Sequence, residues 1–146
     1  MKFKWTQDLN SQTYQDALAI RKAIFIGEQG IDPALEIDDK EEVARHLVAY
    51  RAGEPLACAR LLPLSEETAK VQRVAVLKAQ RDHGIGRELM AECQAYSQEQ
   101  GFKELILHAQ AGRENFYQLC GYQGEGDYFE EAGIPHLQMR LSLAEK

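Results

Sequence analysis

The sequence lacks the features that mark membrane, secreted or fibrous proteins. Residues 1–8 have no apolar core of the kind found in signal peptides, and no apolar run approaches the length that crosses a bilayer. Low-complexity tracts and internal repeats are missing too. We therefore expect a cytoplasmic protein without a membrane partner. Its 146 residues predict one domain, 1–146, with room for a sizeable core.

Cysteine and positive charge are also scarce. Cys58, Cys93 and Cys120 form neither an even set nor a metal-ligand spacing, and each falls inside an apolar stretch. This pattern predicts buried, reduced thiols and no metal site. The 17 lysines and arginines against 23 aspartates and glutamates give a net charge of -6, which argues against a nucleic-acid partner.

The pattern of apolar residues predicts a mixed α/β fold. Two β-rich segments joined by a short turn that contains Gly53 and Pro55 predict an antiparallel hairpin. A strand, a helix and a second strand then predict a parallel βαβ unit. The expected strands cover residues 3–6, 46–50, 56–62, 71–77, 104–109 and 136–143, the expected helices begin at about Thr13, Gly84 and Arg113, and 65–70 is expected to be a polar loop.

The segment Arg81-Asp82-His83-Gly84-Ile85-Gly86 lies between a predicted strand and a predicted helix. Glycines let backbone N–H groups approach a ligand without an intervening Cβ. The first turn of a helix leaves N–H groups unpaired and carries partial positive charge, so this turn predicts a pyrophosphate site. Arg81, His83 and Arg87 add positive charge nearby.

Three phosphate-binding motifs compete for this turn. A dinucleotide fingerprint requires a third glycine where Leu89 stands, and a Walker loop requires Gly-Lys-Ser/Thr where Arg87-Glu88 follow the turn. The remaining match, Arg-x-x-Gly-x-Gly, resembles the coenzyme A pyrophosphate turn of the GCN5-related N-acetyltransferases (GNAT). A glycine-rich connection without a ligand is the alternative.

Further segments strengthen the resemblance to this family. Asn115–Tyr122 resembles its second signature, and Arg21–Gln29 and Ala132–Met139 resemble the ElaA-like and YjcF-like subgroup of small bacterial acetyltransferases. The resemblance covers nearly the whole chain. It implies a single-domain GNAT fold, with a central mixed sheet of about six to seven strands flanked by about four helices, and acetyl-CoA as cosubstrate.

The resemblance also implies where the cosubstrate binds. Its pantetheine arm would lie along Val74, Ala75 and Val76, where two parallel strands splay apart. Gln110 departs from the common pattern, because many members carry an asparagine there. The implied cofactor-binding residues are Val74, Ala75, Val76, Arg81, Asp82, His83, Gly84, Ile85, Gly86, Arg87, Gln110, Asn115 and Tyr117.

For catalysis, Tyr117 matches the family tyrosine that protonates the departing thiolate, an acid role that a phenol can fill. In many members, a glutamate that acts as the general base stands on the strand where this chain has Leu105-Ile106-Leu107. Glu28, at the end of the first helix, is the first candidate for the base. His46 is an alternative. His108 is expected to point away from the acetyl group, and attack by a neutral amine or deprotonation through water is left open.

The acceptor is expected to be the primary amine of a small molecule or peptide. The acidic segment Glu36–Glu42 is interpreted first as a solvated connector and second as a lip for a cationic acceptor, and Glu130-Glu131 is a further candidate for the rim. A coenzyme A-binding sensor or interaction module without catalysis is the alternative function. Because dimers are common in the family, a homodimer is also left open.

Overall fold

The computed structural model describes residues 1–143, which form one seven-stranded mixed sheet with the order β1-β2-β3-β4-β5-β7-β6. Only β4 and β5 pair in parallel. The mixed α/β class expected from the sequence is confirmed. The elements are β1 (Lys2–Thr6), α1 (Gln12–Arg21), the π-helical η1 (Lys22–Glu28), α2 (Pro33–Glu36), β2 (Arg45–Arg51), β3 (Glu54–Pro63), β4 (Thr68–Val76), the 3-10 turn η2 (Lys78–Gln80), α3 (Ile85–Glu99), β5 (Glu104–Gln110), α4 (Glu114–Leu119), β6 (Gln123–Glu131) and β7 (Ile134–Ser142).

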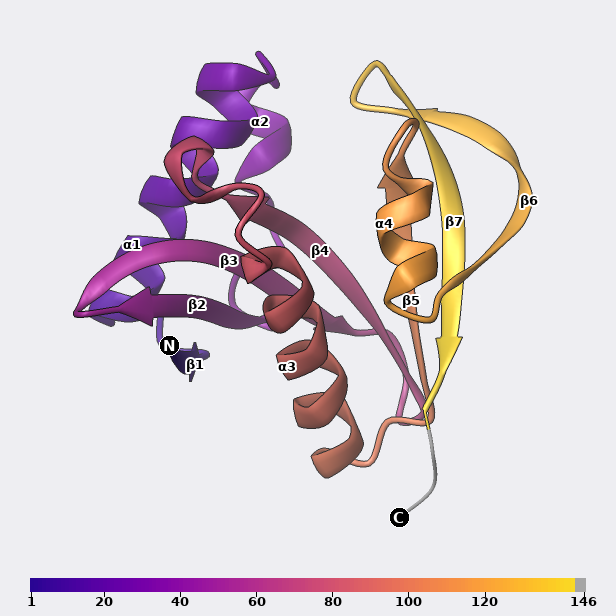
Figure 1. The fold of residues 1–146 in the computed structure, drawn as a ribbon, viewed down its shortest axis with the longest axis horizontal. Coiled ribbons are helices and arrows are strands. Elements are labelled where there is room, and N and C mark those ends of the chain that lie inside the picture. The colour runs from indigo at the N-terminus through magenta and orange to yellow at the C-terminus, as the bar shows by residue number, and fades with distance from the viewer. Residues whose placement is uncertain (144–146) are drawn as a thin grey trace.

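Helices cover both faces of the sheet (Figure 1). On one face α1 and η1 pack their apolar side chains, among them Ile20, against Val48 of β2. On the other face α3 packs its buried stripe, which includes Leu89, against a cluster that contains Leu47. Leu47 and Val48 are neighbours on β2 and therefore point to opposite faces. Among residues 1–143, no helix is both long and apolar enough to cross a membrane.

The start of α1 has a clear local cause. The Ser11 hydroxyl accepts a hydrogen bond from the backbone N–H of Tyr14 at 3.2 Å, which satisfies one of the free donors of the first turn. Tyr14, Ala17 and Ile20 then face the core at helical spacing. The helix continues as η1, and the chain turns away at Gly30, where φ is +67°.

The sheet opens between β4 and β5. These strands pair only from Thr68 opposite Glu104 to Val71 opposite Leu107, and beyond this point they diverge into the V seen in Figure 1. At the divergence β4 contains a bulge, with Arg73 at a φ of +55° and a shift in the register with β3. The backbone groups of β4 that face β5 beyond Val71 therefore have no strand partner.

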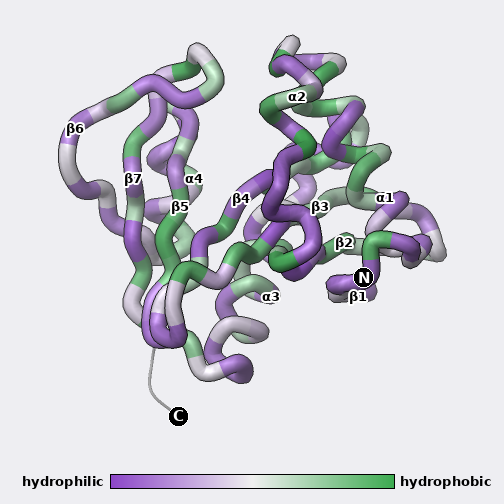
Figure 2. The backbone as a smooth tube through the Cα atoms, turned by 180° about the vertical axis from the view of Figure 1, so that it is seen from behind, coloured by the Kyte–Doolittle hydropathy of each residue, from purple (hydrophilic) through white to green (hydrophobic). Residues whose placement is uncertain are grey.

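Strands β4 and β6 differ from the sequence prediction. Strand β4 begins at Thr68, inside the expected polar loop, because Ala69 and Val71 are buried. Strand β6 was not predicted at all. It pairs with β7 alone, and its hydrophilic residues show no alternation (Figure 2). At Gly124 a Cβ would lie 2.8 Å from Leu137 Cδ2, so this glycine lets β6 approach β7.

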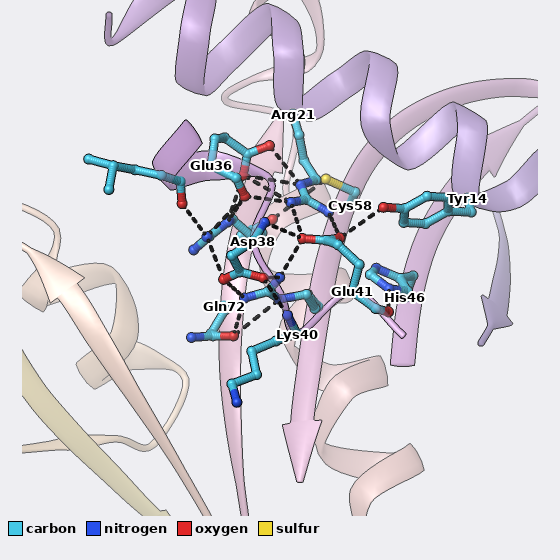
Figure 3. A network of polar contacts seen from close by, with 12 residues as sticks. Tyr14, Arg21, Glu36, Asp38, Lys40, Glu41, His46, Cys58 and Gln72 are labelled. Carbon is cyan, nitrogen blue, oxygen red and sulfur yellow. Dashed lines mark hydrogen bonds and ion pairs between the residues drawn. The ribbon is translucent and has the colours of Figure 1, made fainter. Parts of the chain in front are cut away.

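The acidic segment Glu36–Glu42 contains a buried ion network, which is drawn in Figure 3. Arg21 Nε donates to Glu36 at 2.9 Å, and its Nη1 donates to Glu41 at 2.7 Å. Arg60 Nη1 donates to the other oxygen of Glu41, also at 2.7 Å. Two arginines therefore share one carboxylate in the interior.

The network reaches the bulge of β4. Arg73 Nε lies 2.6 Å from Glu36 Oε2, and Asp38 accepts a hydrogen bond from Arg60 at 2.8 Å. Glu36 and Glu41 are only 3% and 5% exposed. Both interpretations of the acidic segment are therefore wrong for these two residues, because their carboxylates neutralise buried arginines that come from distant parts of the sequence.

The arginines determine the ionisation of the carboxylates. Burial by itself would raise the pKa of Glu41, but the hydrogen bond and charge of Arg21, with the charge of Arg60, lower it below the ordinary value. The pKa of Asp38 is lowered by Arg60 against the same burial effect. These groups stabilise the fold fully above the ordinary carboxyl range near pH ~4, and their contribution is lost progressively as the pH falls from there through their lowered pKa in the folded protein.

We expect Glu41→Gln to lower the free energy of unfolding at pH 7 by about 3–5 kcal/mol, because two buried guanidinium groups lose their shared carboxylate. Urea denaturation measures this loss. The deficit relative to the parent should begin to shrink below about pH 4, where the carboxylate becomes protonated in the unfolded chain, and should disappear only below the lowered pKa of Glu41 in the folded protein.

Glu42→Gln is the matched control, since Glu42 is the exposed neighbour on the same segment. Its effect should stay within about 0.5 kcal/mol. Equal losses in the two variants, or a Glu41→Gln deficit that does not change with pH, would contradict the stabilising role of the network.

Candidate active site

Two cavities meet where β4 and β5 diverge. The turn cavity, of about 480 Å³, is lined by Val74–Val76 of β4, the segment before α3, the start of α3 and part of α4. The sheet cavity, of about 320 Å³, lies between the residues of β4 from Lys70 to Val74 and the end of β5, with α2 and the β6–β7 turn beside it. The residues that line both are Gln29, Val74, Arg113 and Tyr117.

The glycine turn forms one end of the turn cavity. Asp82 and Gly84 have φ values of +65° and +78°, and α3 begins directly afterwards. The first backbone bond of α3 runs from Glu88 N–H to Gly84, so the N–H groups of residues 85–87 lack an intrahelical partner. A Cβ at Gly86 would lie 3.1 Å from the Phe116 ring. These free donors at a helix start fit an anionic group such as a pyrophosphate.

Most of the predicted cofactor-binding residues line the turn cavity. His83 and Asn115 are exposed and line neither cavity. Gln110 lines the sheet cavity instead, where its amide donates to Gln29 at 2.9 Å. The predicted residues that do line the turn cavity are Val74, Ala75, Val76, Arg81, Asp82, Gly84, Ile85, Gly86, Arg87 and Tyr117.

Glu28, the first candidate for the base, lines neither cavity. Its two carboxylate oxygens accept hydrogen bonds from Arg81 at 2.9 and 2.7 Å, and Arg81 Nε donates to the carbonyl of Val76 at 3.0 Å. The bond with Arg81 lowers the pKa of Glu28. The position of Glu28 therefore corrects the expectation that it faces the acceptor: the pair joins the end of η1 to the glycine turn.

His46, the alternative base, also lies outside both cavities. It is buried under the ion network, where its Nε2 lies 2.9 Å from the carbonyl oxygen of Glu41. Burial lowers the pKa of His46. The contact with the backbone holds this histidine in the interior of the fold. A base must reach the ligand, and His46 lines neither cavity.

Tyr117 occupies the junction of the two cavities. It lies on α4, and its ring packs edge-on against Phe116 and Tyr122 at centroid distances of 5.0 and 6.2 Å. Burial raises the pKa of Tyr117 to about 12, against an opposing effect of Arg113. The phenol therefore stays protonated at neutral pH and can donate a hydrogen bond or a proton to a ligand in either cavity.

The outer wall of the sheet cavity includes His108, Glu131 and His136. The expectation that His108 points away is wrong, because Leu107 and Ala109 on either side of it belong to the core under α3 and His108 takes the other face. His108 Nδ1 lies 2.9 Å from Glu131 Oε1, and this hydrogen bond lowers the pKa of Glu131. Of the predicted rim pair, Glu131 lines the cavity and Glu130 does not.

Among the residues of the site that sequence reasoning missed are Lys70, Gln29 and Arg113. Lys70 alternates with the buried residues Ala69 and Val71, so a strand assigned from Thr68 would have placed it on the cavity face. Gln29 and Arg113 follow no periodic pattern. They reach the site because the end of η1 and the start of α4 converge on the divergence of the sheet.

Comparisons with known proteins agree with this geometry. The family model of the acetyltransferase (GNAT) domain matches residues 12–143. An uncharacterized N-acetyltransferase of Bacillus subtilis, YjcF, is 33% identical over 131 residues, which cover 89% of this chain and 93% of that protein. The protein ElaA of Escherichia coli is 34% identical over 134 residues, which cover 88% and 86%.

Solved structures show the same architecture. The crystal structure of a putative N-acetyltransferase from Lactobacillus plantarum matches with a TM-score of 0.90 and 29% identity, over 98% of each chain. A GNAT family acetyltransferase from Elizabethkingia anophelis, solved with acetyl-CoA bound, matches with a TM-score of 0.73 over 97% of each chain, and its 19% identity shows a likeness of fold alone. From the family model and the relatives together, the chain belongs to the GNAT family and is an acyltransferase.

Proposed function

We propose that the chain transfers an acetyl group from acetyl-CoA to the primary amine of a small molecule or peptide, by direct attack in a ternary complex. The observation that carries the proposal is the meeting of the two cavities at Val74 and Tyr117. Two ligands that enter the turn cavity and the sheet cavity would touch at this point. The acetyl-CoA bound to the structural neighbour from Elizabethkingia anophelis supports the choice of cosubstrate.

In this proposal the turn cavity holds the cosubstrate. The free N–H groups at the start of α3 receive the pyrophosphate, and the exposed Arg87 adds charge. The open edge of β4 along Val74–Val76 bonds the amide groups of the pantetheine arm. A backbone N–H beside the Arg73 bulge polarises the thioester carbonyl, which is an oxyanion-hole role.

Side chains of the protein then supply and remove the protons of the reaction. The neutral amine attacks the carbonyl carbon, so that a C–N bond forms and the C–S bond breaks. Tyr117 donates to the departing sulfur. The amine nitrogen becomes strongly acidic once it is bonded to the carbonyl carbon, so an ionised carboxylate suffices to take its proton. Glu131 fills this role in the proposal in place of Glu28, because Glu131 lines the sheet cavity and Glu28 does not.

Thermal unfolding with acetyl-CoA, coenzyme A, NAD and ATP at equal concentrations tests the cosubstrate. We expect only the two coenzyme A species to raise Tm, by an amount that corresponds to about 2.7 kcal/mol at a hundredfold excess over Kd. A larger shift with NAD or ATP would mean that the glycine turn binds a different phosphate ligand.

Tyr117→Phe should lower kcat by about 100-fold or more while the Kd for acetyl-CoA stays unchanged, since the phenol donates to the leaving group and not to the bound ground state. Release of free thiol measures the rate. Tyr96→Phe is the control, because Tyr96 stacks on Trp5 and lines neither cavity. Full activity in Tyr117→Phe would refute the acid role.

The two candidate bases are separated by paired variants. Glu131→Gln should reduce kcat/KM for the amine by about 100-fold or more, and Glu28→Gln should leave it within a few-fold of the parent. Thiol-release kinetics at saturating acetyl-CoA measure both. The opposite ranking, with the Kd for acetyl-CoA intact, would return the base role to Glu28.

A further inference from the structure

The sheet cavity contains charges of both signs, and its two carboxylates already have partners. Glu36 is bound by Arg73 at 2.6 Å and by Arg21 at 2.9 Å. Glu131 is bound by His108 at 2.9 Å. The acidic segment therefore contributes no free carboxylate to this cavity, although its charge in the sequence suggested a site for a cationic acceptor.

Lys70 is the exception among the charged residues of the sheet cavity. It projects from β4 and is half-buried, and within residues 1–143 its ammonium has no hydrogen bond and no carboxylate within 4.0 Å. Burial lowers the pKa of Lys70, and only attraction to Glu131 opposes this effect. A half-buried cation without a partner has lost part of its hydration without replacing it, which is unfavourable until an anion binds.

Arg113 is exposed and adds a second cation at the junction of the cavities. It lines both cavities, and its guanidinium makes no hydrogen bond or ion pair with the part of the chain that the structure describes. Since Glu36 is bound by two arginines and Glu131 by His108, the charged groups of the sheet cavity that have no partner among residues 1–143 are Lys70 and Arg113. The local charge thus opposes the net charge of -6 of the whole chain.

We infer that the amine acceptor itself carries an anionic group, a carboxylate or a phosphate, which Lys70 binds while Glu131 faces the amine. This inference rests on the proposed function of the same site. Lys70 and Glu131 attract one another across the cavity without being paired. A ligand with one charge of each sign fits between them, whereas a polyamine would meet one carboxylate and two unpaired cations.

Matched pairs of probes test the inference. They are L-amino acids against their amides and glucosamine 6-phosphate against glucosamine, with spermidine as the polycation. Binding is read as the rise in Tm of the protein saturated with coenzyme A, and turnover as thiol release from acetyl-CoA. We expect the anionic member of at least one pair to bind more tightly, and Lys70→Met to weaken that binding about tenfold or more, because a charge-assisted hydrogen bond is lost.

Two further variants separate the charge of Lys70 from a loss of packing. Lys70→Arg keeps the cation and should keep the preference for the anionic probe. Lys103→Met removes an exposed lysine outside both cavities, and we expect it to change nothing. The inference is overturned if neither pair shows tighter binding of the anionic member, or if Lys70→Met keeps that preference. It is also overturned if glucosamine or spermidine binds as tightly as the anionic probe.

The two readouts distinguish this inference from the proposed function. Anionic probes that bind in a Lys70-dependent way without thiol release would support the inference and count against acetyl transfer. Thiol release that is equally fast with the amine lacking the anion would support acetyl transfer and overturn the inference.

Discussion

The divergence of β4 from β5 beyond Val71 is the feature on which the rest of the site depends. A parallel pair that continued to the strand ends would satisfy its backbone groups internally and close the space between the strands. Because the pairing stops, both cavities open at one place and the edge of β4 beyond Val71 has no strand partner in β5. The bulge at Arg73 occurs where β4 turns away from its neighbour.

The buried ion network stabilises the bulge of β4 at which the two strands diverge. Arg73 binds Glu36 with its side chain and also donates to the backbone carbonyl of Glu36 at 3.0 Å, while the thiol of Cys58 contacts the Arg73 carbonyl at 3.5 Å. The strained φ at Arg73 is thereby fixed by partners on two other segments. The same contacts secure α2, whose end forms one wall of the sheet cavity. The charges of Arg73 and Glu36 are thus used within the fold.

Much of the fold could be predicted from local patterns. The β2–β3 hairpin, the βαβ unit and α3 follow from β-branched runs, turn residues and a helical stripe, and each was found near its expected bounds. The glycine turn could also be predicted, because glycines between a strand and the start of a helix let backbone N–H groups approach an anion. Strand β6 could not be predicted, because it is an edge strand with few buried residues. Its apolar and polar residues therefore do not alternate with a period of two.

Residues close together along the chain are enough to predict the fold class, the glycine turn and the position of Tyr117 in its motif. Which charges are available to a ligand depends instead on how distant segments pack against one another. Glu28 and Glu36 look free in the sequence but are occupied by Arg81, Arg21 and Arg73, whereas Lys70 looks like part of a loop and lines the cavity. Ion pairing depends on distances of a few ångströms between segments far apart in sequence, and no local pattern encodes those distances.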